Sequence, residues 1–360
     1  MSTPESTLTQ TSGAETSRRA LLAAGVGVAA GLLLEACTGG AGNPAATGSE
    51  APHHDASPSA SAAATPEAKR GSEFGDTMVF VDMPATAEAA RNQADGVAAQ
   101  LRAIAASGRK PFVVMEPNSV DLHNVSADPF KALFAALKEN NIDHKTIGTW
   151  APFPEANIPQ WGEDKTTDPD LFRRNFGTFS DALKGAFPEA RTSVLLNSTS
   201  YLNGDWGNPS KAASALLPYV QGTGADELCF QGFPWCNDTT DPAKFANPEV
   251  AITVAASMGG PGKVGVRLNT GTYSQQTNPD TGAIDRMTDD QRAATLEGEL
   301  QTAKALKQAG YDTTLQVFAQ NKFPAEADWS YPAGSQINQT LNNVLDEATA
   351  AGINTAVFQG

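Results

Sequence analysis

The sequence predicts a (β/α)8 barrel, the TIM-barrel fold, over residues 76–360. Eight short apolar runs recur along these roughly 285 residues, which is enough chain for one large domain. Amphipathic helical patterns separate the runs, and strands that alternate with helices imply a parallel sheet with right-handed crossovers. Eight such units at this length favour a barrel over an open doubly wound sheet.

Each predicted strand is one of these short apolar runs. The eight runs are Met78–Asp82, Phe112–Glu116, Thr146–Trp150, Ser193–Asn197, Glu227–Gln231, Val264–Leu268, Thr314–Ala319 and Thr355–Phe358. Two helices between or after them are marked by their ends. Thr288 and Gln291 form a capping-box pair that opens a helix ending near Gly310, and Gly352 ends a helix predicted over Ser335–Ala351.

The first 37 residues predict a twin-arginine lipoprotein signal. Paired arginines, Arg18 and Arg19, precede the uncharged apolar run Ala20–Leu34, which is too short for a comfortable bilayer span. The LEAC sequence that ends at Cys37 resembles a bacterial lipobox, in which the cysteine is acylated and becomes the new N-terminus. We expect an exported protein, either held at the outer face of the cytoplasmic membrane by Cys37 or secreted after a plain signal peptide.

Residues 38–75 predict a disordered linker. The segment consists mainly of Ala, Ser, Pro and Gly, with almost no large apolar side chain. Such a composition cannot bury enough surface to offset the entropy cost of ordering the chain. The sequence therefore divides into a signal over residues 1–37, a tether over 38–75 and a barrel over 76–360.

Composition excludes several classes of partner. The formal net charge of −15 and a pI near 4.7 disfavour direct binding to nucleic acid or anionic lipid head groups. Because CxxC, HExxH, GxGxxG and Walker patterns are missing, we expect no metal and no cofactor. Cys229 and Cys236 are able to form one disulfide outside the cytoplasm, and a reduced pair is the alternative.

Candidate site residues follow the predicted strands, because the chemistry of this fold lies at the carboxyl ends of its strands. Carboxyl groups there suit catalysis: Asp82, Glu116 and Glu155 follow the first three strands. Aromatic and amide side chains suit sugar rings and hydroxyls, or alternatively pack the loops. The residues expected to bind substrate are Trp150, Asn157, Trp161, Trp235, Asn269, Tyr273 and Trp329.

A glycosidase needs one carboxyl group that donates a proton and one that is ionised. Glu155 lies between apolar residues such as Phe153 and Pro154, which favours the neutral form and a general-acid role. Glu116 is the expected second group and Asp82 the next choice. A structural role is the alternative for Glu116, as an anchor for a backbone group or for Arg267, which needs a partner inside a strand.

Several segments resemble glycoside hydrolase family 26. The order of PEANIPQWG, DPDLFRRNFG, ELCFQGFPW and LQVFAQNKFPAEADWSY is similar to that of the family's motifs, over roughly residues 110–345. The resemblance implies a (β/α)8 barrel that cleaves β-mannans and related β-glucans with retention, with Glu155 as the acid/base. It also places Asn157, Trp161 and Trp235 on family positions.

One departure from the family matters for mechanism. Its catalytic nucleophile is a glutamate in a stretch of the type Ile-Gly-Glu-Thr-Gly-Ser, and Asn269 occupies that place here. An amide cannot form a glycosyl ester, so the retaining mechanism is in doubt. Three functions stay open: a monomeric, membrane-anchored hydrolase of a β-linked polysaccharide, a carbohydrate-binding pseudoenzyme, and a solute-binding lipoprotein that serves a transporter.

Overall fold

The computed structural model of the chain describes residues 76–118, 120–158, 168–198, 208–232, 247–277, 282–319 and 327–358. It confirms eight parallel strands arranged in one curled sheet, in the order in which they occur along the chain. These strands are β1 (Asp76–Asp82), β2 (Lys110–Glu116), β3 (Thr149–Pro152), β4 (Arg191–Asn197), β5 (Glu227–Gly232), β6 (Gly265–Gly271), β9 (Asp312–Phe318) and β11 (Asn354–Phe358). The predicted signal, Cys37 and the linker lie outside the described residues.

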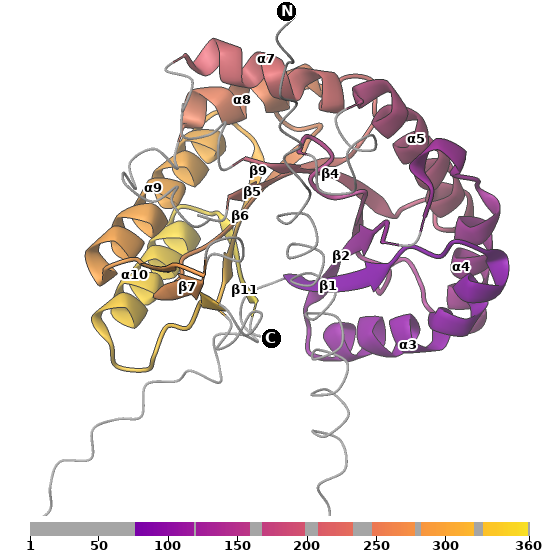
Figure 1. The fold of residues 1–360 in the computed structure, drawn as a ribbon, viewed down its shortest axis with the longest axis horizontal. Helices are drawn as coiled ribbons and strands as arrows, with labels where there is room; N and C mark the ends of the chain where they lie inside the picture. The colour runs from indigo at the N-terminus through magenta and orange to yellow at the C-terminus, as the bar shows by residue number, and fades with distance from the viewer. Residues whose placement is uncertain are drawn as a thin grey trace, which may run out of the picture.

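Helices cover the outer face of this sheet, as Figure 1 shows. They are α3 (Ala87–Ala106), α4 (Asp128–Glu139), α5 (Pro169–Ala186), α7 (Pro209–Val220), α8 (Pro248–Ser257), α9 (Asp289–Gln308) and α10 (Gln336–Ala350), with a short 3-10 turn, η1 (Leu122–Asn124). Thr288 and Gln291 form the capping box that the sequence predicts at the start of α9. No helix within the described ranges combines the length and the apolar character that a bilayer span requires.

The two edge strands of the curled sheet, β1 and β11, approach each other. They are not joined by a ladder of backbone hydrogen bonds in the described part of the chain. An aromatic contact crosses the seam instead: the ring centroids of Phe80 on β1 and Phe358 on β11 lie 6.3 Å apart. Side-chain packing, and not a backbone ladder, therefore joins the first and last strands of the sheet.

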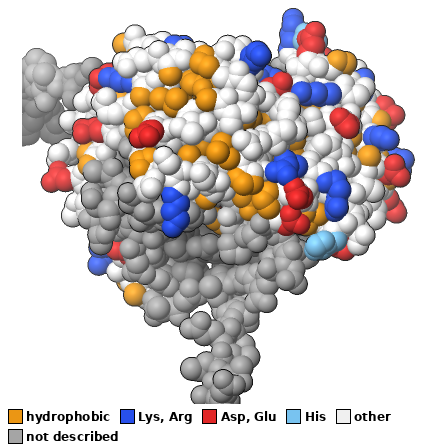
Figure 2. Space-filling model, turned by 90° about the horizontal axis from the view of Figure 1, so that it is seen from above, with side chains coloured by type: hydrophobic (Ala, Val, Ile, Leu, Met, Phe, Trp, Pro, Cys, Tyr) orange, Lys and Arg blue, Asp and Glu red, His pale blue; other side chains and the backbone are white. Residues whose placement is uncertain are grey.

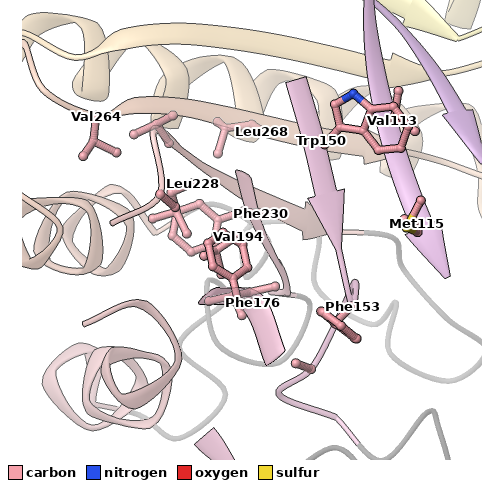
Figure 3. Packing of buried hydrophobic residues seen from close by; sticks show 14 of the residues in the cluster. Val113, Met115, Trp150, Phe153, Phe176, Val194, Leu228, Phe230, Val264 and Leu268 are labelled. Atoms are coloured by element: carbon pink, nitrogen blue, oxygen red, sulfur yellow. The ribbon is translucent and has the colours of Figure 1, made fainter. Parts of the chain in front are cut away.

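Alternate residues of each strand face two different cores, because side chains in a strand alternate between its faces. Outward residues such as Val113, Val194 and Leu268 pack against the helices (Figure 3). Inward residues form a separate cluster: Met78, Phe112, Val114, Ala151, Leu195, Cys229, Phe318 and Phe358. Cys229 is a free, fully buried cysteine in this inner cluster, which agrees with the reduced alternative; Cys236 lies outside the described residues.

A buried ion pair lies inside the ring of strands. Arg267 Nε donates to Glu227 Oε1 at 2.9 Å, and Arg267 Nη1 donates to Gln316 Oε1 at 2.9 Å. The guanidinium also lies over the ring of Phe112, with 4.2 Å between Cζ and the centroid. Arg267 therefore has the partner that the sequence demanded, but that partner is Glu227 rather than Glu116.

A small antiparallel sheet, absent from the sequence prediction, lies beside the carboxyl end of β6. Its strands are β7 (Gln275–Thr277), β8 (Ile284–Arg286) and β10 (Ala327–Asp328), in the order β10-β7-β8.

On the outer surface, Figure 2 shows acidic and basic side chains interspersed on one face. Ile284 is the one large apolar side chain that is exposed among the described residues.

We predict that Arg267→Met lowers the free energy of unfolding by about 3–5 kcal/mol, because it leaves the carboxylate of Glu227 buried without its main partner. The double variant Arg267→Met/Glu227→Leu should recover part of that loss. Urea unfolding followed by circular dichroism measures both. Lys304→Met, which breaks a more exposed ion pair with Glu347, is the control and should cost no more than about 1 kcal/mol. Equal losses for Arg267→Met and Lys304→Met would contradict the prediction.

Candidate functional site

Glu155 lies in a strained turn directly after β3. Phe153 and Glu155 have φ angles of 53° and 54°, in the left-handed region that residues with a side chain rarely adopt. The backbone N–H of Glu155 donates to the carbonyl of Leu195 on β4 at 2.8 Å, which holds this conformation. A strained backbone that its surroundings maintain is a frequent mark of a functional position.

Two amide side chains hold the carboxyl group of Glu155. Asn197 Nδ2, at the end of β4, and Gln231 Nε2, at the end of β5, both donate to Glu155 Oε1 at 2.9 Å. Glu155 itself is only 7% exposed. Hydrogen bonds from N–H groups favour the ionised form of a carboxyl group. The two amides therefore fix both the place and the charge of Glu155.

Asn157 supports this arrangement from behind rather than facing a ligand. Its Nδ2 donates to the carbonyl of Asn197 at 2.7 Å, and its Oδ1 accepts from the N–H of Asn197 at 2.9 Å. Both ends of the amide are thus bonded to backbone. The expectation that Asn157 binds substrate gives way to a role in holding Asn197.

The other two predicted carboxyl groups lie together at the ends of β1 and β2. Asp82 and Glu116 are paired positions in the ladder, and Asn118 Nδ2 donates to Asp82 Oδ1 at 2.7 Å and to Glu116 Oε2 at 3.3 Å. Glu116 is 1% exposed, whereas Asp82 is exposed. The three catalytic candidates therefore come from neighbouring strand ends.

Burial raises the pKa of Glu116 to about 8, and the negative charges of Asp82 and Glu155 act in the same direction. The hydrogen bond from Asn118 opposes them. Glu116 is consequently protonated at neutral pH. A neutral carboxylic acid thus lies within electrostatic reach of a carboxylate that two amides hold, which is the pairing that acid–base chemistry needs.

Trp150 does not face this site, so its assignment to substrate binding is wrong. The side chain is fully buried on the outer face of β3, its Nε1 donates to the carbonyl of Ile147 at 2.8 Å, and its ring lies 5.3 Å from that of Phe134 (Figure 3). The reason is the two-residue alternation of the strand. Thr149 and Ala151 occupy the inward positions, and the residue between them must point outward.

Tyr273 and Trp329 form a wall beside the end of β6. Their ring centroids lie 5.8 Å apart, and both side chains are buried. A Cβ at Gly271 would lie 2.9 Å from Phe318 Cβ and 3.0 Å from Trp329 Cε3, so glycine permits this approach. Tyr273 also donates its hydroxyl to Asp285. Their contact with a sugar stays a prediction, and Trp161 and Trp235 lie outside the described residues.

Asn269 lies in the interior, 1% exposed, and its Nδ2 donates to Gln231 Oε1 at 3.2 Å. It therefore supports Gln231, which in turn holds Glu155. Asn197, Gln231 and Gln316 were not among the predicted site residues. Asn197 and Gln231 are polar and occupy inward, period-two positions near the ends of predicted strands, a signal that marks both of them, whereas Gln316 lies within its strand.

Metal ligation finds no support in the described residues, where no group of three or more His, Cys, Asp or Glu side chains is placed to hold an ion.

A fourth buried carboxyl group lies on the helical side of the sheet. Glu299, on α9, is 2% exposed, its Oε1 would lie 3.4 Å from a Cβ at Gly232, and burial raises its pKa to about 8.

We predict a pH-dependent stability that identifies the protonated form of Glu116. Its pKa in the folded protein, about 8, exceeds the ordinary value of 4.5. The stability that its proton contributes is therefore complete below about pH 4.5 and is lost as the pH rises through 8. Glu116→Gln removes this loss, so its free energy of unfolding relative to wild type should rise by roughly 3–5 kcal/mol between pH 4.5 and 9.

Urea unfolding at both pH values measures this difference. Glu299→Gln should behave in the same direction, because its carboxyl group is also buried with a raised pKa. Glu88→Gln, at an exposed position of α3, should show no change with pH. A constant difference between Glu116→Gln and wild type across this range would show that Glu116 is ionised in the folded protein.

Known proteins resemble the chain in fold and not in sequence. No family model matches the sequence, and no curated protein matches it. Solved structures that resemble the fold include fungal β-1,4-galactanases (11% identity over 73% of this chain and 84% of that chain, TM-score 0.49). A β-mannanase of Thermomonospora fusca (13%, 79% and 78%, 0.43) and an endo-1,4-β-mannanase of Rhizomucor miehei (13%, 76% and 86%, 0.46) are also similar. At these identities and TM-scores the likeness carries no argument about function, which depends on the site.

Proposed function

We propose that the chain is a glycoside hydrolase that acts on a β-linked polysaccharide such as mannan or β-glucan. The observation that carries the proposal is the pair of carboxyl groups at the mouth of the barrel. Glu116 is buried with a pKa raised to about 8, and Glu155 accepts two amide hydrogen bonds. Two carboxyl groups whose surroundings separate their pKa values are the usual basis of glycosidic bond cleavage.

The roles follow from these surroundings. Glu116 holds a proton at neutral pH and donates it to the glycosidic oxygen, so that the leaving group departs as an alcohol. Glu155 supplies the negative charge that stabilises the oxocarbenium-like transition state. Water forms the new bond to the anomeric carbon as the glycosidic bond breaks, Glu155 accepts the proton that the water loses, and exchange with solvent restores the proton of Glu116. The sequence favours Glu155 as the acid, but the hydrogen bonds from Asn197 and Gln231 favour its carboxylate form. We therefore assign the acid role to Glu116.

Export belongs to the same proposal. The twin-arginine pattern and the lipobox-like sequence support acylation of Cys37 and a tether over residues 38–75. A protein held at the outer face of the cytoplasmic membrane, or secreted, meets polysaccharide there. Metabolic labelling with a fatty acid tests the anchor, because label on the wild type that persists in Cys37→Ala would contradict acylation at Cys37.

We predict that Glu116→Gln and Glu155→Gln each lower the release of oligosaccharides from β-mannan or mixed-linkage β-glucan by about 10²–10⁴-fold. A substrate with an activated leaving group, a 2,4-dinitrophenyl glycoside, separates the two roles because it needs no proton donor. Glu116→Gln should keep most of its activity on that glycoside, whereas Glu155→Gln should lose it. Reducing-sugar release and dinitrophenolate absorbance are the two measurements.

The pH profile and a control complete this test. Wild-type activity on polysaccharide should fall as the pH rises through about 8, where Glu116 loses its proton. Glu88→Gln, an exposed change on α3, should leave both activities unchanged. If Glu155→Gln, rather than Glu116→Gln, keeps the activity on the dinitrophenyl glycoside, the two roles are the reverse of those proposed.

A carbohydrate-binding pseudoenzyme is the second candidate, and one observation favours it. At the place that the family resemblance assigns to the nucleophile, Asn269 is buried and bonded to Gln231. Binding of mannan or β-glucan in affinity electrophoresis, without release of reducing sugar from any substrate, would establish this function. In that case Glu155→Gln weakens binding and changes nothing else.

A further inference from the structure

Four amide side chains form a row across adjacent strands inside the barrel. Asn197, Gln231, Asn269 and Gln316 occupy paired positions on β4, β5, β6 and β9. Their neighbours two residues away on these strands include Leu195, Cys229 and Phe318 of the inner cluster, so the row shares its inward face. We call these four residues the amide row.

Two charged groups, Arg267 at one end of the amide row and Glu155 at the other, fix the orientation of its amides. Arg267 carries donors only, and its Nη1 donates to Gln316 Oε1 at 2.9 Å. The Oε1 of Gln316 therefore faces Arg267, and its Nε2 points away from Arg267. At the opposite end, Glu155 Oε1 accepts from Gln231 Nε2. Gln231 Oε1 then accepts from Asn269 Nδ2 at 3.2 Å, so Asn269 presents Oδ1 in the other direction.

These assignments leave one donor and one acceptor on neighbouring strands. Gln316 Nε2 and Asn269 Oδ1 have no hydrogen-bond partner in the described part of the chain, although the two side chains are 0% and 1% exposed. Paired positions on adjacent strands lie about 5 Å apart. Buried polar groups of this kind are normally satisfied, and each is destabilising when it is not.

The surroundings favour a small partner. On β11, the position paired with Gln316 is Ala356, whose side chain is a single methyl group. On the other side, Asn269 Nδ2 lies 3.9 Å from Met78 Sδ. A single partner for both atoms accepts from Gln316 Nε2 and donates to Asn269 Oδ1 at the same time. A hydroxyl group does both, whereas a carboxylate, an ammonium group or a metal ion does only one.

We propose that a single O–H group bridges Gln316 Nε2 and Asn269 Oδ1, and so completes a hydrogen-bond relay from Arg267 to Glu155. The relay runs Arg267, Gln316, O–H, Asn269, Gln231, Glu155, with every N–H pointing toward the carboxylate. Gln316 and Asn269 are positioning residues in this relay, since they act on Glu155 through Gln231. The O–H group comes from water or from a hydroxyl of a bound sugar; the second source rests on the proposed function.

Crystal structures with and without a probe test the proposal directly. The probes are mannotetraose and cellotetraose, soaked into crystals of the Glu155→Gln variant to prevent turnover and compared with unsoaked wild-type crystals. We expect an oxygen about 2.7–3.2 Å from both Gln316 Nε2 and Asn269 Oδ1 in the unsoaked crystals. Continuity of that oxygen with a sugar ring after soaking identifies a substrate hydroxyl; an unchanged isolated oxygen identifies a structural water.

Either source supports the bridge, and its failure is distinct from failure of the proposed function. A direct hydrogen bond between Gln316 Nε2 and Asn269 Oδ1, or density that lies on only one of them, would overturn the bridge even if the protein hydrolyses glycans. Conversely, a bridging water in a protein that cleaves no glycan would leave the bridge standing and remove the proposed function.

Solution measurements add a readout that a merely structural role would not move. Gln316→Met removes the donor to the bridge, and Gln339→Met, the same change at an exposed position of α10, is the control. For a water bridge we expect kcat to fall about tenfold with KM unchanged; for a sugar hydroxyl we expect KM to rise about tenfold. Identical kcat, KM and pH profile for Gln316→Met and wild type would count against the relay. The wild-type crystals decide the matter if Gln316→Met fails to fold.

Discussion

The two hydrogen bonds that Glu155 Oε1 accepts from Asn197 and Gln231 are the interaction on which the candidate site depends. Glu155 belongs to a turn with left-handed φ angles, whereas its two donors belong to strands whose register the parallel ladder fixes. A loop residue is thereby given the positional precision of a strand residue. Without these two hydrogen bonds, the strained turn alone would not hold the carboxyl group in this position.

Burial first, and then the charges around it, explain why a second carboxyl group at the mouth stays neutral. The guanidinium of Arg267 pairs with Glu227, and Glu155 Oε1 accepts hydrogen bonds from two amides. Ionising Glu116 as well would place a further negative charge near Glu155 and Asp82, and those two charges join burial in raising its pKa. The proton on Glu116 thus follows mainly from its burial and, to a smaller extent, from the two negative charges near it.

The sequence predicts the fold well, because eight apolar runs bounded by turns are a strong signal. All eight predicted strands are present, with ends displaced by up to three residues: the third begins at Thr149 and not at Thr146. The sheet of β7, β8 and β10 was missed because strands of two or three residues carry no periodic pattern. The seam between Phe80 and Phe358 was equally invisible, since it joins the first and last strands.

At the site, the sequence predicts which residue types occur better than it predicts where their side chains point. Glu116, Glu155 and Asp82 do lie together, because strand ends converge in this fold. The assignment of Trp150 to substrate binding was wrong because a one-residue difference along a strand reverses the face to which a side chain points. Asn157 failed because an amide that follows a strand is as well suited to holding backbone as to binding a ligand. Gln316 was passed over since it lies within a strand, and only the register shows that it belongs with Asn269.

The identity of residue 269 also matters for how Glu155 is held. An amide at this position donates to Gln231 with one end and presents an acceptor with the other. A carboxylate there has no donor for Gln231 Oε1, so the Gln231 amide would be free to turn and Glu155 Oε1 would lose one of its two bonds. It would also add a negative charge to an interior that already holds Glu155 and Glu227. An amide at position 269 therefore has a role of its own, because it holds Gln231 and, through Gln231, Glu155.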